Sequence, residues 1–140
     1  MERAARALGS RDLSAVELDA RLDRARIAPA ARAETIERLT EAGAVDDERF
    51  AQSRARALAD RGAGNLLVQH DLETRGIAPS AVEAAIALLD EETIRAARIC
   101  ARRGAGPKTA RYLARKGFSE DAIVTACTEG IAEEDTPAVR

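Results

Sequence analysis

The chain is poor in the residues that build large cores and β-sheets: among its 140 residues it has no Trp, one Tyr and two Phe. Hydrophobic residues make up 46% of the sequence, but 32 of them are alanine, so large apolar side chains are few. Residues that favour strands are scarce, whereas alanine has the highest helix propensity. The composition therefore predicts an all-α protein with a thin core, and the length excludes a large multidomain enzyme.

Metal-ligating and membrane-spanning patterns are also absent from the sequence. The two cysteines, Cys100 and Cys127, have no second Cys or His at the spacing of zinc ligands, so we expect two reduced thiols and no metal or cofactor. No apolar run approaches the roughly 18 residues that cross a bilayer, and the first ten residues lack the apolar middle of a secretory signal. These absences predict a cytoplasmic protein without a membrane partner.

A set of five apolar positions recurs along the chain. The first copy consists of Leu8, Leu18, Leu22, Ile27 and Ile36. A shift of 50 residues gives Leu58, Val68, Leu72, Ile77 and Ile86, and a further shift of 41 gives Ile99, Thr109, Leu113, Phe118 and Cys127. Helices of about ten residues are marginal alone in water, so each must pack against partners. We predict three tandem three-helix repeats, at 1–45, 46–90 and 91–132, which form an elongated, curved array, followed by a disordered tail at 133–140.

Polar residues, prolines and glycines divide each repeat into helices. Ser14 with Glu17, and Ser80 with Glu83, have the spacing of a capping box at a helix start. Other predicted start signals are Asp46 or Asp47, Pro107 and Ser119, and the stop signals are Gly62, Gly76 and Gly117.

Short motifs in register with the repeats point to a known family. The middle helices of two repeats end on a basic residue, a glycine and an aromatic or aliphatic residue, as Arg75-Gly76-Ile77 and Lys116-Gly117-Phe118. The first repeat closes on Gly43, two apolar residues, two aspartates and, three residues further on, Phe50-Ala51. This arrangement resembles the RecX family of bacterial regulators of the RecA recombinase, over nearly the whole chain.

The first repeat departs from the family pattern at three positions, one of which is Ala44, a small residue where a larger apolar one is common. Arg26 stands where glycine is usual, and Arg32 stands where the other copies have Val82 and Ile123. A more polar end unit is what a stacked array needs for solubility, so we expect the first repeat to be an atypical end unit.

The resemblance implies a regulator and not an enzyme. RecX-like proteins lie in the groove of the RecA filament on DNA, span neighbouring subunits, and restrain its ATPase and strand-exchange activity. We therefore expect this chain to be a monomer that binds the filament and takes part in recombination, DNA repair and the SOS response.

No group of residues in the sequence predicts catalysis. Asp46 and Asp47 are adjacent at a helix start, where an aspartate caps free amides and stabilises the helix by about 1 kcal/mol. His70 is the single histidine, and no nucleophile motif accompanies it. We therefore predict no catalytic residues.

The most uneven feature of the sequence is its charge. The net charge is −2, yet residues 95–117 contain eight cations and no acidic residue. These cations are Arg95, Arg98, Arg102, Arg103, Lys108, Arg111, Arg115 and Lys116. Six of them follow a spacing of three and four, which places a basic stripe on each of two helices.

We predict that these eight residues form a partner-binding surface. Few aromatic residues are available for stacking on bases, so the surface should contact phosphate or carboxylate groups. Two alternatives stay open: a helical nucleic-acid-binding module that grips the DNA phosphate backbone, and a basic face that is merely solvated.

Overall fold

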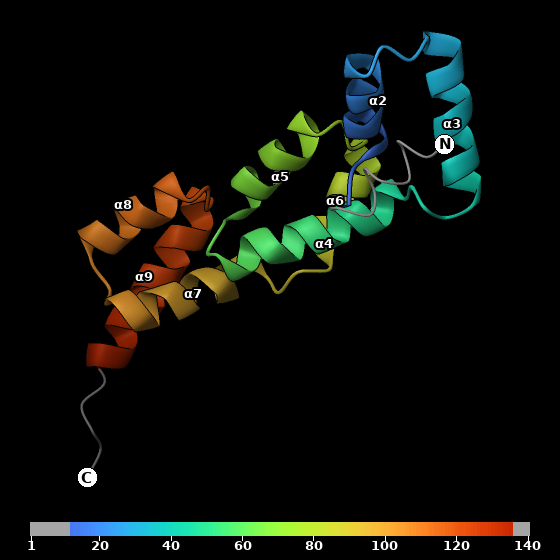
Figure 1. Ribbon diagram of the computed structural model, residues 1–140. Helices are drawn as coiled ribbons and strands as arrows, with labels where there is room; N and C mark the ends of the chain where they lie inside the picture. The colour runs from blue at the N-terminus through green and yellow to red at the C-terminus, as the bar shows by residue number, and fades with distance from the viewer. Residues whose placement is uncertain (1–11, 136–140) are drawn as a thin grey trace.

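The computed structural model describes residues 12–135, which form α-helices and no strands (Figure 1). The helices are α2 (Ala15–Arg24), α3 (Pro29–Glu41), α4 (Asp47–Asp60), α5 (Asn65–Thr74), α6 (Pro79–Ala87), α7 (Glu92–Arg103), α8 (Pro107–Arg115) and α9 (Glu120–Asp135). The predicted all-α class is confirmed. The predicted first helix, which would contain Leu8, lies outside the described residues, and so do residues 136–140 of the predicted disordered tail. Residues 133–135, which were also predicted to be disordered, belong to the end of α9. None of the described helices is long and apolar enough to cross a membrane.

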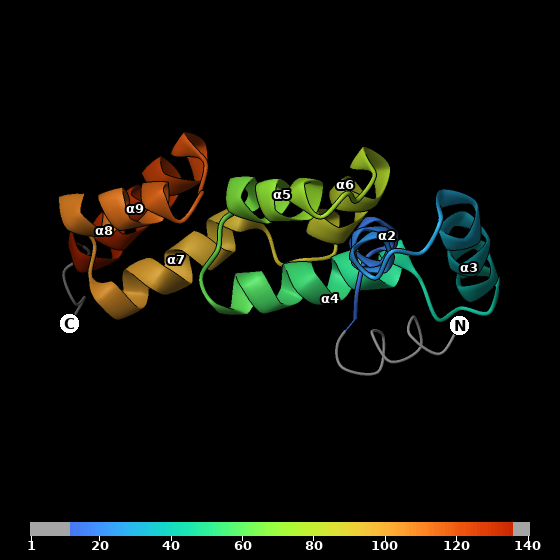
Figure 2. The same cartoon turned by 45° about the horizontal axis from the view of Figure 1, so that its top comes forward.

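The helices are arranged as three successive groups in an elongated array (Figures 1 and 2). We call α2 with α3 the first unit, α4 to α6 the second, and α7 to α9 the third. Each unit has its own cluster of buried apolar side chains. The core is therefore divided into three small parts, as a chain with few large apolar residues requires.

Equivalent positions of the three units are buried alike. Leu22, Leu72 and Leu113, which occupy the same place in the repeat, are 2%, 0% and 0% exposed. Thr109, the one polar residue of the repeated set, is also buried, and its hydroxyl donates to the Gly104 carbonyl at 2.5 Å. The predicted repeat is confirmed, and the polar exception is satisfied by a local hydrogen bond.

Most of the predicted helix starts are confirmed. The Ser14–Glu17 capping box is formed on α2, Asp46 accepts from the Arg49 amide at 3.1 Å, and Ser119 accepts from the Ala122 amide at 3.2 Å. The predicted Ser80–Glu83 capping box is wrong. Because Pro79 supplies the fixed φ of a first helical position, α6 begins at Pro79, its N-cap is Ala78, two residues before Ser80, and Ser80 lies inside the helix.

The two cysteines are free thiols on α7 and α9, as expected. Cys100 is buried and Cys127 is partly buried in the core of the third unit. Burial raises the pKa of the Cys100 thiol to about 11, and the neighbouring Cys127 adds to this rise. At neutral pH Cys100 is therefore an apolar core residue and a poor nucleophile.

The second and third units are joined by direct backbone contact, which we call the second joint. The Gly64 amide donates to the Lys116 carbonyl at 2.8 Å, and the Leu66 amide donates to the Gly117 carbonyl at 3.0 Å. A Cβ atom on Gly64 would collide with the backbone of Gly117 and Phe118, and one on Gly117 would lie 2.6 Å from the Leu67 nitrogen. Glycine is needed at both positions because two backbones touch there.

The first and second units meet at the equivalent place, which we call the first joint, but through a side chain. The Ser14 hydroxyl donates to the Arg75 carbonyl at 2.7 Å, and a Cβ atom on Gly76 would lie 2.5 Å from the Val16 side chain. At this joint a serine hydroxyl bridges to the next unit, at the repeat position where the second joint has the amide of Gly64.

In both joints a carboxylate from the next unit caps the middle helix of the preceding one. Asp47, the first residue of α4, accepts from the Ala15 amide at 2.9 Å. Glu92, the first residue of α7, accepts from the Asn65 amide at 2.7 Å. Free amides at a helix start favour negative charge, so each acid fixes the orientation of two adjacent units.

An ion-pair network strengthens the first joint. Arg75 contacts Glu17 at 2.8 Å and Asp71 at 2.9 Å, and Arg54 also contacts Asp71 at 2.9 Å. The hydrogen bond from Arg54, with a further one from Arg75, holds the pKa of Asp71 below its ordinary value, against the opposing effect of burial.

Two departures of the first unit from the family pattern have local explanations. Arg26 adopts the left-handed backbone conformation, with φ of 64°, and its side chain is exposed. No other described unit packs on this position, so a side chain is tolerated there at the cost of backbone strain. Arg32 pairs with Asp19 at 3.0 Å and Asp23 at 3.3 Å, which satisfies its charge at the edge of the core.

We predict that Gly64→Ala destabilises the protein much more than Gly43→Ala. Gly43 has φ of 76° with nothing near its missing Cβ, so alanine there adds only backbone strain of about 1 kcal/mol. Gly64 has an ordinary φ, and alanine there forces two backbones apart and breaks hydrogen bonds, which should cost about 3 kcal/mol. Urea unfolding of both variants measures the difference, and equal losses would contradict the joint.

We also predict that Arg26→Gly stabilises the protein, by about 0.5 to 1 kcal/mol, because it relieves a left-handed conformation. The matched control is Arg21→Gly, an exposed position inside α2, which should cost about 1 kcal/mol through lost helix propensity. Thermal unfolding should therefore shift in opposite directions for the two variants. A loss of stability in Arg26→Gly would contradict the strain at this position.

Candidate partner-binding surface

The structure divides the eight predicted site residues among three environments. Arg95 is buried, whereas the other seven are exposed or partly exposed on α7, on α8 and just after α8. Of these seven, three line a groove beside the second unit, three lie on the outer face of α8, and Lys116 lies near Gly62.

Arg95 is an internal residue of the second joint. Its side chain is 8% exposed and donates to the carbonyls of Ala63 at 2.8 Å and Asp90 at 2.9 Å, and to the side chain of Asn65. Its guanidinium also lies 5.8 Å from the centre of the Phe118 ring. Burial lowers the pKa of Arg95, although the nearby acids Glu92 and Asp90 oppose this effect. Arg95 is therefore removed from the surface set, and its role is to hold two units together.

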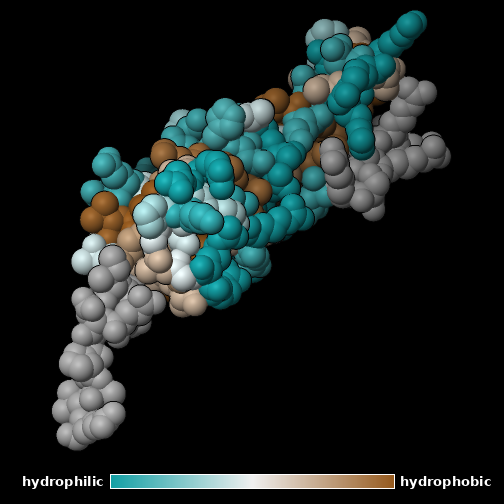
Figure 3. Space-filling model, turned by 90° about the vertical axis from the view of Figure 1, so that its left-hand side faces the viewer, coloured by the Kyte–Doolittle hydropathy of each residue, from teal (hydrophilic) through white to brown (hydrophobic). Residues whose placement is uncertain are grey.

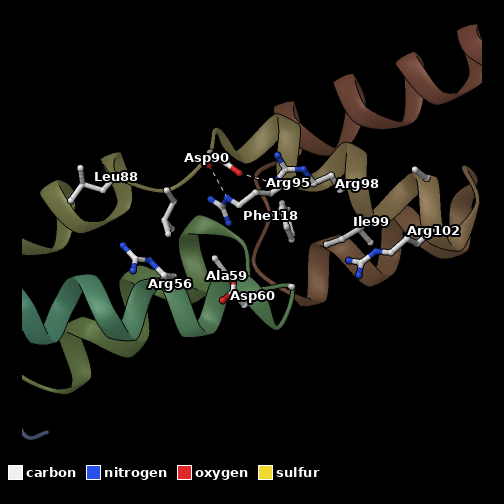
Figure 4. Close-up of a pocket in the computed structure, with 13 residues that line it drawn as sticks. Arg56, Ala59, Asp60, Leu88, Asp90, Arg95, Arg98, Ile99, Arg102 and Phe118 are labelled. Atoms are coloured by element: carbon white, nitrogen blue, oxygen red, sulfur yellow. Dashed lines mark hydrogen bonds and ion pairs between the residues drawn. The ribbon is translucent and has the colours of Figure 1, made fainter.

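A groove of about 630 Å³ lies between the second and third units (Figure 4). Arg56 and Leu88 form its wall on the second unit, and Ile99 and Arg102 form its wall on α7. A smaller hollow of about 300 Å³ continues it and shares Gly62, Ile99 and Arg102. We call these two hollows together the basic groove. Its arginines are Arg56, Arg61, Arg95, Arg98, Arg102 and Arg103.

Two arginines of the basic groove were missed by the sequence analysis. Arg56 lies on the exposed side of α4, and Arg61 is the C-cap of the same helix. Both belong to the second unit, about 40 residues before the basic segment. Because the joint brings these distant segments together, no local charge pattern marks them, and only the fold places them beside α7.

The arginines of the groove differ in their contacts. Arg98 pairs with Asp90 at 2.7 Å, both side chains being 60% exposed. The Arg103 guanidinium lies 3.7 Å from the centre of the Tyr112 ring. Arg56 and Arg102 make no ion pair with any other residue in the described part of the chain, so they are available to an anionic ligand.

The second basic stripe is on the outer face of α8. Lys108, Arg111 and Arg115 lie opposite Thr109 and Leu113, the buried positions of that helix, as the spacing of three and four predicted. Hydrophilic side chains cover most of the end of the array that the third unit forms (Figure 3). The stripe is therefore exposed to solvent and lines neither hollow of the groove.

The acidic residues considered as ligands have structural roles. Asp46 caps α4, and Asp47 caps α2 across the first joint. Among the described residues no group of three or more His, Cys, Asp or Glu is placed to hold a metal ion.

These features define a class of protein: an array of three-helix units with a cationic surface beside the second joint and on α8. The family model for RecX, second three-helix domain, matches residues 46–86, which form the second unit. Regulatory protein RecX of Xanthomonas axonopodis pv. citri is 34% identical over 136 residues, covering 90% of this chain and 84% of that protein. Regulatory protein RecX of Stenotrophomonas maltophilia (strain K279a) is 35% identical over 133 residues, covering 88% of this chain and 82% of that one. The chain belongs to the RecX family.

Solved structures of RecX proteins share the fold. The crystal structure of RecX from Lactobacillus salivarius matches with a TM-score of 0.82 at 21% identity, and the match covers 94% of each chain. A second structure, of a regulatory protein RecX, matches with a TM-score of 0.77 at 17% identity, over 89% of this chain and 69% of that one. The array architecture is therefore retained at low sequence identity.

We predict that Arg95→Met destabilises the protein by about 3 kcal/mol, because acceptors of the second unit and of the segment that follows it lose their donor on α7. Arg98→Met is the matched control. Its single ion pair is largely exposed, so the loss should be below about 1 kcal/mol. Chemical unfolding of the two variants checks this, and equal losses would show that Arg95 does not hold the joint.

Proposed function

We propose that the protein regulates a RecA recombinase filament by binding along it and restraining its ATPase and strand-exchange activity. Membership of the RecX family supports the choice of RecA as the partner. The observation that carries it here is the placement of unpaired arginines from two units on one groove. Carboxylates and phosphates, both abundant on a nucleoprotein filament, are the groups that arginine binds best.

The rigid joints are suited to contacting several filament subunits at once. Hydrogen-bonded backbones fix the angle between units, so the groove and the outer face of α8 stay at a constant separation. Two weak contact areas held at a matching distance bind with an effective concentration that neither has alone. A row of small units can therefore restrain a filament although each contact is modest.

The proposal includes no chemical step carried out by the protein itself. His70 is exposed, and the acidic residues at the helix starts are engaged as caps. Restraint of the filament would come from occupation of its surface, and the ATP hydrolysed would be the recombinase's own substrate.

One observation favours a second function, direct binding of DNA phosphates. Lys108, Arg111 and Arg115 form an exposed cationic face on α8, and none of them pairs with an acid among the described residues. Such a face can follow a duplex backbone without reading bases. Binding through it would weaken steeply with salt, because each phosphate contact releases counterions.

We predict that the protein lowers the DNA-dependent ATPase rate of a RecA filament, and that reversing three exposed cations abolishes most of this effect. The variant is Arg102→Glu with Arg111→Glu and Arg115→Glu. Three reversals of about 1 kcal/mol each should weaken binding about a hundredfold. Arg and Glu have similar helix propensity, so the circular dichroism signal should be unchanged.

The matched control reverses three exposed arginines of the first unit, Arg21, Arg24 and Arg38, and should retain the inhibition. If the wild-type protein leaves the ATPase rate unchanged but binds duplex DNA tightly at physiological salt, the DNA-binding function replaces the regulatory one. If the three-site variant still inhibits like wild type, the third unit is not the regulatory surface.

A further inference from the structure

We propose that the basic groove binds an acidic peptide segment that also carries large apolar side chains. This inference rests on the proposed function, because the segment would belong to the partner that the protein regulates. The segment would bind in the basic groove and not on the outer face of α8.

The charge of the groove favours an anionic ligand. Its two hollows contain six arginines and two aspartates, Asp60 and Asp90, a net charge of +4 in a chain whose net charge is −2. Asp90 is already paired with Arg98. The unpaired guanidinium groups of Arg56 and Arg102 stand on opposite walls, so a carboxylate-bearing segment in the groove can meet a cation on each side (Figure 4).

The apolar residues of the groove favour a peptide over a simple anion. Leu88 directly follows α6 and is 68% exposed on one wall, and Ile99 and Phe118 also line the groove. An exposed leucine cannot donate a hydrogen bond to a phosphate. A large apolar side chain of a bound segment would cover Leu88 and so remove apolar surface from water.

The groove lacks what a nucleic acid needs. Phe118 is only 4% exposed, and the ring of Tyr112 is covered by the Arg103 guanidinium, so neither ring is open for stacking on a base. A segment that mixes carboxylates with apolar side chains matches both kinds of lining residue.

The position of the groove makes it preorganised. Arg56 and Leu88 come from the second unit and Arg102 from the third, and the second joint between these units is fixed by the Gly64 and Arg95 contacts. Binding therefore requires little reordering of the walls, which lowers its entropic cost.

The test measures binding of a fluorescein-labelled peptide, EDLEDIFEDLEE, by fluorescence anisotropy with the full chain at physiological salt. The peptide carries carboxylates and places Leu, Ile and Phe at helical spacing. The reference probes are EDSEDSSEDSEE, which has the same charge without apolar side chains, and a labelled poly-thymidine strand. We expect the first peptide to bind at least about tenfold tighter than either reference.

Two groove variants and two matched controls locate the site. Arg56→Gln with Arg102→Gln, and separately Leu88→Ser, should each weaken binding of the first peptide about tenfold. Arg21→Gln with Arg24→Gln, on α2, and Val124→Ser, an exposed apolar residue on α9, should leave it unchanged. All these side chains are exposed, and none of them makes a joint contact, so circular dichroism should show every variant folded.

Equal binding of the two peptides, or an unchanged affinity in Leu88→Ser, would overturn the proposal, since the groove would then be an unselective anion surface. The ATPase rate of the RecA filament with the same variants separates this failure from that of the proposed function. If the groove variants lose the peptide but still restrain the filament, the groove is not the partner's contact and the inference falls while the regulator stands. If peptide binding behaves as expected but wild type does not affect the filament, the regulatory function falls and the groove serves another acidic partner.

Discussion

The contact between two backbones at Gly64 and Gly117 is the constraint on which the shape of the binding surface depends. Each unit has a small core, and within residues 12–135 the buried apolar side chains form one separate cluster in each unit. Orientation is set instead by two amide–carbonyl hydrogen bonds at a distance that excludes any side chain. Because the basic groove takes one wall from each of the two units, its width follows directly from this contact.

The connection is made twice with different chemistry, and the equivalent positions of the two outer units differ from it. Ser14 bridges with its hydroxyl at the place where Gly64 uses its amide, and Asp47 and Glu92 cap equivalent helices. At the first unit Arg26 occupies the glycine position, where the side chain would collide with a preceding unit. At the third unit Pro107 stands where Leu66 donates its amide, and proline has no N–H to donate.

The sequence was informative about the fold because the repeat constrains it three times. Leu22, Leu72 and Leu113 have the same spacing to their neighbours, so burial of one predicts burial of the others.

The surface was less predictable because spacing along a helix does not distinguish a buried arginine from an exposed one. Arg95 and Arg98 belong to one stripe by sequence, yet Arg95 lies inside the joint. Arg56 and Arg61 are absent from any local charge pattern because the fold alone brings α4 beside α7. Ser80 failed as a cap because the preceding proline is a stronger start signal than a serine.

The joints also explain how a chain with a negative net charge presents a basic surface. Several acids are engaged inside or between units: Asp47 and Glu92 cap helices of the preceding unit, and Glu17 and Asp71 pair with arginines of the first joint. Carboxylates held in this way by amides and guanidinium groups neutralise less of the outer surface than free ones would. The cations after Arg95 have no acid within their own segment, and the fold supplies only Asp60 and Asp90 to the groove. The positions at which the fold pairs its acidic residues therefore determine the local charge of the binding surface. The net charge of −2 does not predict that local charge.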